Sequence, residues 1–190
     1  MIYAAIAGEN FEMADRTAAS RLRSGDPEAL SEVVTHYQHR LYRYLARLVR
    51  DTASAEDLFQ QTWLQVMGQL SRYDSARSFD TWLFAIAHNL AMDALRKRSG
   101  ERLEDYEFEL PDRQSNALAA VLAGERAATV AAALTGLPPL YREALTLRFE
   151  EGLKLEEIAE VTGAPLSTVK SRVQRGLEAM RRRLSKDLLS

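Results

Sequence analysis

Residues 153–173 read Leu-Lys-Leu-Glu-Glu-Ile-Ala-Glu-Val-Thr-Gly-Ala-Pro-Leu-Ser-Thr-Val-Lys-Ser-Arg-Val. The spacing predicts two helices joined by a tight turn. Ala159 is small where two helices must cross closely, and Gly163 supplies a turn that a residue with a Cβ resists. Val169 and Val173 are four residues apart, so both face the core from the second helix. The stretch therefore predicts a helix-turn-helix.

The second helix of this motif continues into a basic end. Residues 165–186 contain seven bases and one acid, a local net charge of +6 in a chain whose formal net charge is −2. Such a helix can enter a DNA major groove, with its early residues at base edges and later ones near phosphates. A solvated amphipathic helix is the alternative, but the turn motif and the charge together favour DNA binding. The candidate DNA-contacting residues are Ser167, Thr168, Lys170, Ser171, Arg172 and Arg175.

Apolar residues spaced by three and four predict three helices before residue 100. The first begins at Asp26-Pro27-Glu28, where Asp caps the helix, Pro fits its first position and Glu suits its first turn. The second runs from Thr52 to Leu70. The third follows Ser78, a predicted N-cap, and ends in the basic run 96–98, which suits a helix C-terminus.

The composition then changes at an acidic segment. Residues 101–112 hold six acids and one base, which predicts a linker. Beyond it we expect an Ala-rich helix over about 115–134 and another over 140–150. The expected fold is all-α, with two small helical domains joined by a flexible acidic linker. The expected boundaries are a disordered N-terminal extension at 1–12, domains at 13–99 and 115–190, and a linker at 100–114.

Several classes of protein are excluded or disfavoured. The chain has no cysteine, so disulfides, thiol nucleophiles and cysteine-bound metals are excluded. His36 and His39 are three apart but have no third ligand in register, and no Gly-rich phosphate loop or nucleophile elbow is present. We therefore expect neither an enzyme nor a bound cofactor. No apolar run is long enough to span a membrane and no signal peptide is evident, so we expect a cytoplasmic protein with no membrane insertion.

The order of these pieces resembles the extracytoplasmic-function (ECF) group of bacterial RNA polymerase sigma factors, over about residues 20–185. Residues 57–66 (Asp-Leu-Phe-Gln-Gln-Thr-Trp-Leu-Gln-Val) resemble the segment that binds core polymerase. Residues 79–98 resemble the segment that contacts the promoter −10 element, and residues 137–173 resemble the −35 reader. The helix-turn-helix alone is weak support, because response regulators share it. All three segments in this order are highly specific.

The resemblance implies a docking surface for core RNA polymerase, whose β′ and β subunits are the expected partners. The implied residues, which would dock on the clamp helices of β′, are Asp57, Gln60, Gln61, Trp63 and Leu64. Trp63 and Leu64 lie off the inner stripe of their helix, so they can form an apolar anchor with a polar rim. Periodicity alone allows equally that Trp63 covers the local core.

The resemblance also implies a −10 site in the loop at 71–80 and the following helix. The candidates are Tyr73, Arg77, Ser78, Phe79, Asn89, Arg96 and Lys97. A polar loop pocket can hold a base flipped from the stack, and aromatic rings can stack on single-stranded bases. Asn89 would read a base edge, while Arg96 and Lys97 would hold phosphates. The alternative for Phe79 is packing in the core.

The resemblance predicts a sigma factor that directs promoter-specific initiation through the −10 and −35 elements, aids promoter melting and is controlled by an anti-sigma factor. Its expected partners are core RNA polymerase, promoter DNA and that anti-sigma factor. Two alternatives remain open. One is a stand-alone helix-turn-helix regulator that uses residues 153–185 on duplex DNA. The other is a helical adaptor that binds a protein partner through residues 26–98 and contacts no promoter.

Overall fold

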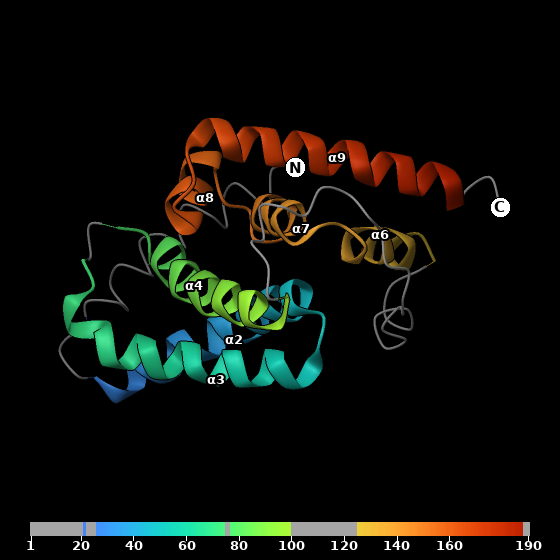
Figure 1. The fold of residues 1–190 in the computed structure, drawn as a ribbon. Helices are drawn as coiled ribbons and strands as arrows, with labels where there is room; N and C mark the ends of the chain where they lie inside the picture. Colours follow the sequence, from blue (N-terminus) through green and yellow to red (C-terminus); the bar gives the residue numbers. More distant parts are fainter. Residues whose placement is uncertain (1–20, 22–25, 75–76, 100–124, 188–190) are drawn as a thin grey trace, which may run out of the picture.

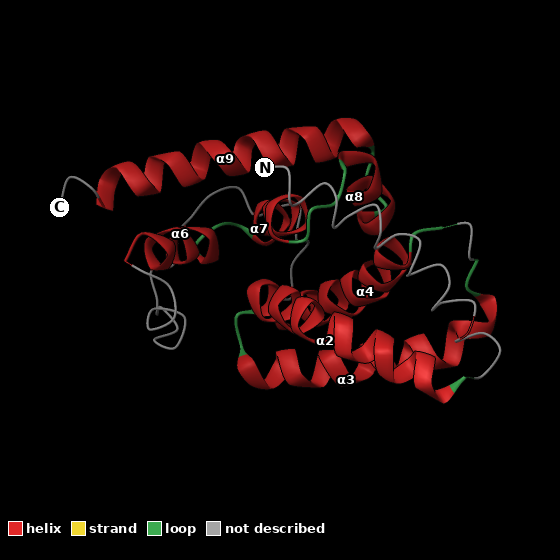
Figure 2. Ribbon diagram, turned by 180° about the vertical axis from the view of Figure 1, so that it is seen from behind, coloured by secondary structure: helices red, strands yellow, loops and turns green. Residues whose placement is uncertain are grey.

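The computed structural model describes residues 21, 26–74, 77–99 and 125–187, and all the regular secondary structure in these ranges is helical (Figures 1 and 2). This confirms the all-α expectation. The expected N-terminal extension, the acidic linker and the first half of the Ala-rich helix lie outside the described residues.

The first unit contains three long helices and one short 3-10 turn. They are α2 (Pro27–Val49), α3 (Thr52–Gln69), η1 (Leu70–Arg72) and α4 (Phe79–Ser99). The start of α2 is as predicted, because the Asp26 carboxylate accepts hydrogen bonds from the backbone N–H groups of Glu28 and Ala29. These helices form one layer of the molecule (Figure 1).

The second unit forms the other layer. It contains α6 (Glu125–Thr135), α7 (Pro139–Leu145), the π-helical turn η3 (Thr146–Glu150), α8 (Leu155–Thr162) and α9 (Leu166–Asp187). The sequence predicted one helix over 140–150, but the α-helix ends at Leu145. The backbone then widens into the π turn, and the N–H of Glu151 donates to the carbonyl of Thr146, five residues earlier.

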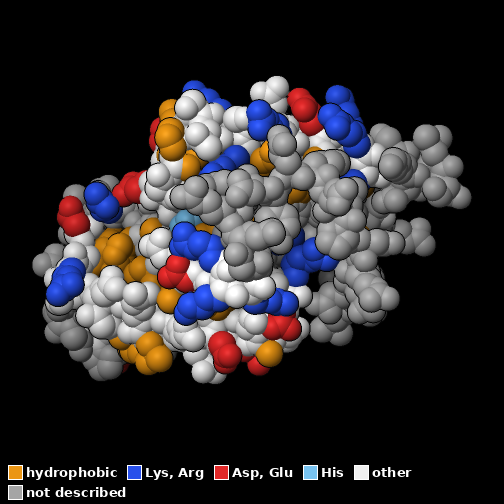
Figure 3. Space-filling model, viewed as in Figure 1, with side chains coloured by type: hydrophobic (Ala, Val, Ile, Leu, Met, Phe, Trp, Pro, Cys, Tyr) orange, Lys and Arg blue, Asp and Glu red, His pale blue; other side chains and the backbone are white. Residues whose placement is uncertain are grey.

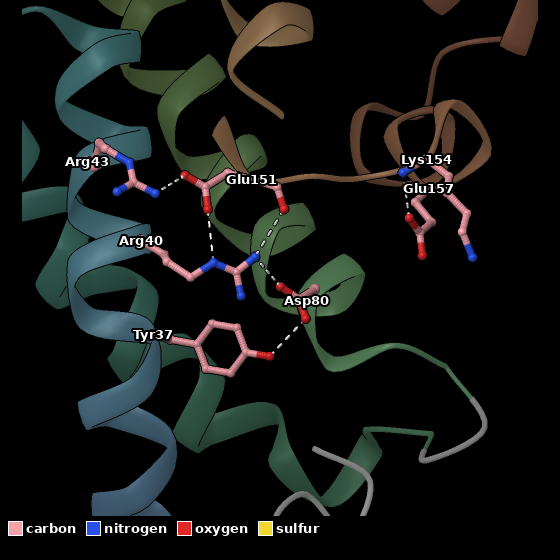
Figure 4. Close-up of polar contacts among 7 residues, drawn as sticks. All are labelled: Tyr37, Arg40, Arg43, Asp80, Glu151, Lys154 and Glu157. Carbon is pink, nitrogen blue, oxygen red and sulfur yellow. Dashed lines mark hydrogen bonds and ion pairs between the residues drawn. The ribbon is translucent and has the colours of Figure 1, made fainter. Parts of the chain in front are cut away.

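The helix-turn-helix consists of α8, the turn at Gly163 and α9. Gly163 ends α8 with a φ of 64°, a left-handed conformation that suits glycine. At the other end of α8, the Glu157 carboxylate accepts the backbone N–H of Lys154 at 2.6 Å (Figure 4). Ile158 on α8 and Val169 on α9 are buried. The predicted motif is therefore present.

The two units share one continuous hydrophobic core. Tyr44 and Phe84 of the first unit belong to the same cluster of buried side chains as Leu147, Ile158 and Val169 of the second. Both views place α8 beside α4 (Figures 1 and 2). A smaller cluster lies among α6, α7 and α9 and contains Leu134, Leu137, Leu145 and Ala179. The sequence predicted two domains but not that they pack together.

Candidate nucleic-acid interface

The start of α9 presents a polar and basic surface. Val169 is buried and anchors the helix, while Ser167, Lys170 and Arg175 are exposed. The other three candidates for −35 contact are half-buried: Thr168, Ser171 and Arg172. Figure 3 shows Lys and Arg side chains along the edge of the molecule formed by α9. The structure thus brings the six candidates together on the first turns of one helix.

On α3, Trp63 and Leu64 have opposite environments. Trp63 is only 8% exposed, and its ring packs edge-on against Phe59, with ring centroids 6.3 Å apart. In this structure Trp63 therefore covers the local core, which the sequence had left open. Leu64 is 65% exposed, and Met67, one turn later, is 46% exposed. Sequence reasoning missed Met67, although its spacing of three from Leu64 was a signal.

The remaining candidates for polymerase docking share the exposed side of α3. Asp57, Gln60 and Gln61 are all exposed. Their spacing places them on the turns before Leu64, so a polar margin lies beside an apolar pair. This arrangement matches a small interface with an apolar centre and a polar rim.

The aromatic rings around the 73–79 loop are part of the core. Tyr73 and Phe79 are each 2% exposed, and Trp82 packs on both. The Tyr73 hydroxyl donates to the carbonyl of Arg77 at 2.7 Å, which braces the loop. The expectation that Tyr73 and Phe79 offer faces to DNA bases is therefore corrected for this structure, because neither ring reaches the surface. Arg77 is exposed and Ser78 half-buried, so polar loop groups remain accessible.

Farther along α4, three polar candidates lie at the surface. Asn89, Arg96 and Lys97 are exposed, and Arg96 forms an ion pair with Asp93 at 2.6 Å. Asn89 and Arg96 are seven residues apart, so they lie two turns apart on the same side of the helix. An amide followed by a basic end can contact a base edge and then phosphates.

A group of charged side chains joins the two units (Figure 4). Arg40 on α2 lies between Asp80 at the start of α4 and Glu151 after η3, and its Nε donates to Glu151 at 3.0 Å. Arg43 donates to the same Glu151 carboxylate at 2.9 Å. Tyr37 donates to Asp80 at 2.9 Å. Burial disfavours the charge on Arg40, but Asp80 and Glu151 outweigh this effect and hold the pKa of Arg40 above its usual value.

A second buried polar group surrounds Glu143 on α7. Its Oε1 accepts the Tyr44 hydroxyl at 2.6 Å and lies 2.6 Å from Nδ1 of His88. Burial and then the Glu143 carboxylate raise the pKa of Tyr44 well above its usual value. The neighbouring Arg142 donates to the carbonyl of Leu48, one of the last carbonyls of α2. Burial lowers the pKa of Arg142 to about 9.

The described residues offer no sign of a metal centre or of a spanning helix. Within ranges 26–74, 77–99 and 125–187, no cluster of three or more His, Asp or Glu side chains is arranged to hold a metal ion. In the same ranges, no helix has the length and hydropathy needed to cross a bilayer.

Comparisons with known proteins agree with this geometry. The Sigma-70 region 2 family matches residues 33–101, and the Sigma-70 region 4 family matches residues 127–180. The ECF RNA polymerase sigma factor SigW of Bacillus subtilis (strain 168) is 31% identical over 183 residues, which cover 91% of this chain and 98% of SigW.

Two solved structures resemble the fold. CnrH, solved in complex with the cytosolic domain of CnrY, has a TM-score of 0.70 and 25% identity, covering 92% of this chain and 99% of that one. The sigma factor RpoE of Bartonella quintana, solved with the anti-sigma factor NepR, has a TM-score of 0.65 and 22% identity, covering 82% and 96%. With both regions matched in order and SigW aligned over nearly its whole length, this chain belongs to the ECF sigma factors of bacterial RNA polymerase.

Proposed function

We propose that the two units of this sigma factor bind different targets. The first unit binds core RNA polymerase and the −10 element, and the second unit binds the −35 element. One observation carries this proposal. A single chain presents an exposed apolar pair, Leu64 and Met67, within its region 2 match and an exposed basic helix, α9, within its region 4 match.

The polymerase contact is assigned to the exposed side of α3. Leu64 and Met67 form its apolar centre, and Asp57, Gln60 and Gln61 form its polar rim. Apolar side chains that become buried at the centre of a small interface supply most of its binding energy. We assign this surface to the β′ subunit, with the β subunit as a further partner of the bound chain.

The −10 contact is assigned to the polar groups that remain accessible on the loop and α4. Arg77 and Ser78 lie at the end of the loop, and Asn89, Arg96 and Lys97 are exposed on α4. We assign Asn89 to a base edge and Arg96 and Lys97 to phosphates. Tyr73 and Phe79 support the loop from inside rather than stacking on bases. The chain thereby aids melting by holding an unstacked base in a braced polar loop.

The −35 contact is assigned to the first turns of α9 in the major groove. Ser167, Thr168, Lys170 and Ser171 lie near the start of the helix, followed by Arg172 and Arg175. Arginine at a base edge can form a bidentate contact with guanine, whereas lysine suits phosphate.

The chain acts in the cytoplasm. It positions RNA polymerase at the promoter and catalyses no reaction itself. Control by an anti-sigma factor is proposed on the family resemblance, since a solved sigma factor of this fold is bound to an anti-sigma factor. A stand-alone regulator is the second candidate, because α9 presents its polar face without help from any partner.

Binding to purified bacterial core RNA polymerase tests the proposal. A fluorescently labelled chain should bind core saturably in an anisotropy titration, and the complex should retain a DNA fragment that carries both promoter elements. Binding to duplex DNA that core polymerase neither requires nor changes would favour the stand-alone regulator.

A further inference from the structure

The end of α6 and the turn after it are bound by two arginine side chains from other helices. Nη1 of Arg142 on α7 donates to the carbonyl of Thr135 at 2.8 Å and to that of Leu137 at 2.9 Å. Nη2 of Arg183 on α9 donates to the carbonyl between them, that of Gly136, at 2.8 Å. Carbonyls at a helix C-terminus have no partner within the helix and attract cations, so both arginines complete the end of α6.

Arg183 differs from its neighbours in the basic end of α9. Arg181 and Arg182 are exposed, whereas Arg183 is half-buried. Arg183 follows the buried Gly176 by seven residues, so the two lie on the same side of the helix. Charge alone counts Arg183 among the bases that could contact DNA, but its side chain belongs to the packed side of α9.

The absence of a side chain at Gly136 makes room for this arginine. A Cβ at Gly136 would lie 2.0 Å from Nη1 of Arg183 and 2.5 Å from its Cζ. No real Cβ tolerates such contacts, so alanine at this position would displace the guanidinium. The displaced atoms are the far end of a flexible side chain, and the backbone can therefore stay in place.

Arg183 restrains α9 at the end opposite to its proposed reading residues at 167–172. Between these two ends, α9 packs closely on α7, since a Cβ on Gly176 would lie only 3.0 Å from Cγ of Leu145. A shift of one end of a rigid helix about this packed middle also shifts the other end. Apolar packing sets no single direction, whereas a hydrogen bond to one carbonyl does. Base contacts need side chains held within about 0.5 Å, so this restraint affects how well α9 reads DNA.

We propose that Arg183 is a positioning residue for −35 recognition, which fixes the orientation of α9 through the Gly136 carbonyl and contacts no DNA phosphate. The proposal rests on the proposed function of α9. A direct phosphate contact by Arg183, or a contact that only stabilises the second unit, are the two other outcomes of the test.

Two different substitutions break the contact. Arg183→Gln removes the donor and one positive charge, whereas Gly136→Ala displaces the guanidinium and keeps every charge of α9. Arg182→Gln is the matched control, because it removes the same charge from an exposed neighbour. Circular dichroism and urea denaturation check that each variant is folded, and Gly136→Ala decides alone if Arg183→Gln does not fold.

The measurement is the affinity of the holoenzyme, made from core polymerase and the full chain, for two promoter duplexes at several salt concentrations. The duplexes come from promoters that the holoenzyme uses, with the −35 motif intact or scrambled. The ratio of the two affinities reports base reading, and the slope of log affinity against log salt reports phosphate contacts.

Arg183→Gln and Gly136→Ala should each lower the ratio of affinities about five-fold, as expected for part of one base contact, and should leave the salt slope unchanged. The double variant should lose no more than either single variant, because both break the same contact. Arg182→Gln should leave the ratio unchanged.

Three results would overturn the proposal. Equal losses on both duplexes in Arg183→Gln, with a salt slope reduced by about one, would assign Arg183 to a phosphate. An unchanged ratio in the folded variants would leave the contact a stabilising one only, and additive losses in the double variant would separate Gly136 from Arg183. A wild-type holoenzyme that binds both duplexes equally refutes the proposed function instead.

Discussion

Trp63 and Leu64 are neighbours on α3, yet one is buried and the other exposed. Replacing Trp63 by alanine should lower the free energy of unfolding by roughly 3–5 kcal/mol, because a large ring is lost from the core. Replacing Leu64 by alanine should hardly change stability but should weaken binding to core polymerase roughly ten-fold. Urea denaturation and anisotropy titrations measure the two effects.

Val130→Ala is the matched control, because Val130 is an exposed apolar residue on α6, away from this surface. It should affect neither stability nor polymerase binding. Equal loss of polymerase binding in Leu64→Ala and Val130→Ala would show that the exposed side of α3 is not the docking surface.

Arg172 is the side chain of α9 for which a base contact is proposed. Arg172→Ala should weaken binding to a −35 duplex by about 1–3 kcal/mol if the guanidinium binds a base edge bidentately, and it should relax sequence preference at one position. Lys170→Ala should weaken all duplexes alike and reduce the slope of log affinity against log salt by about one. Gel-shift titrations at several salt concentrations distinguish these patterns, and unchanged binding in Arg172→Ala would refute the assignment.

For single residues, the sequence predicted which surfaces could bind a partner better than it predicted the contacts of each side chain. Periodicity placed Trp63 outside the inner stripe of α3, but a long aromatic ring at the border of a stripe can still fold back onto Phe59. Tyr73 and Phe79 were ambiguous for the same reason, since an aromatic residue in a loop suits either a base or the core. Their burial depends on Trp82 and α2, which the sequence does not place around them.

At the scale of single elements, the turn of the helix-turn-helix depends on the backbone of Gly163. Gly163→Ala should destabilise the protein by about 1 kcal/mol, because a Cβ is strained at a φ of 64° although nothing lies within 4 Å of it. Gly68→Ala is a matched control inside α3, where the added Cβ also meets open space. That variant should gain about 0.5–1 kcal/mol of stability. Thermal or urea denaturation gives both values, and equal effects would contradict the role of the turn.

Helix positions were largely predictable because the local signals are strong. The Asp26-Pro27 start and the Gly163 turn follow capping and turn rules, and the second helix from Thr52 follows apolar spacing. All three are present in the structure. The π turn at 146–150 was missed. Its sequence, Thr-Leu-Arg-Phe-Glu, has no breaker and reads as ordinary helix. The π turn occurs where Glu150 and Glu151 contact α2. The helix propensity of a short segment does not predict contacts with a helix far away in the sequence.

At the scale of the whole molecule, the packing of the two units was beyond sequence reasoning. Arg40 and Glu151 are 111 residues apart, and each alone resembles an ordinary surface charge on a helix. The same is true of Glu143, which is buried against Tyr44, 99 residues away. Only the fold brings these partners together and buries the two glutamates, so no pattern along the chain distinguishes Arg40, Glu143 and Glu151 from solvated charges.

The two units are proposed to bind polymerase and the two promoter elements. Transcription with purified core RNA polymerase on genomic DNA of the native host is the most direct test, with the 5′ ends of the transcripts sequenced. The account predicts starts that require this chain and that share two upstream motifs, near −10 and −35. Leu64→Ala should reduce all of these transcripts, whereas Arg172→Ala should reduce chiefly those that depend on the −35 motif. Core polymerase that starts at the same positions with and without the chain would contradict the account.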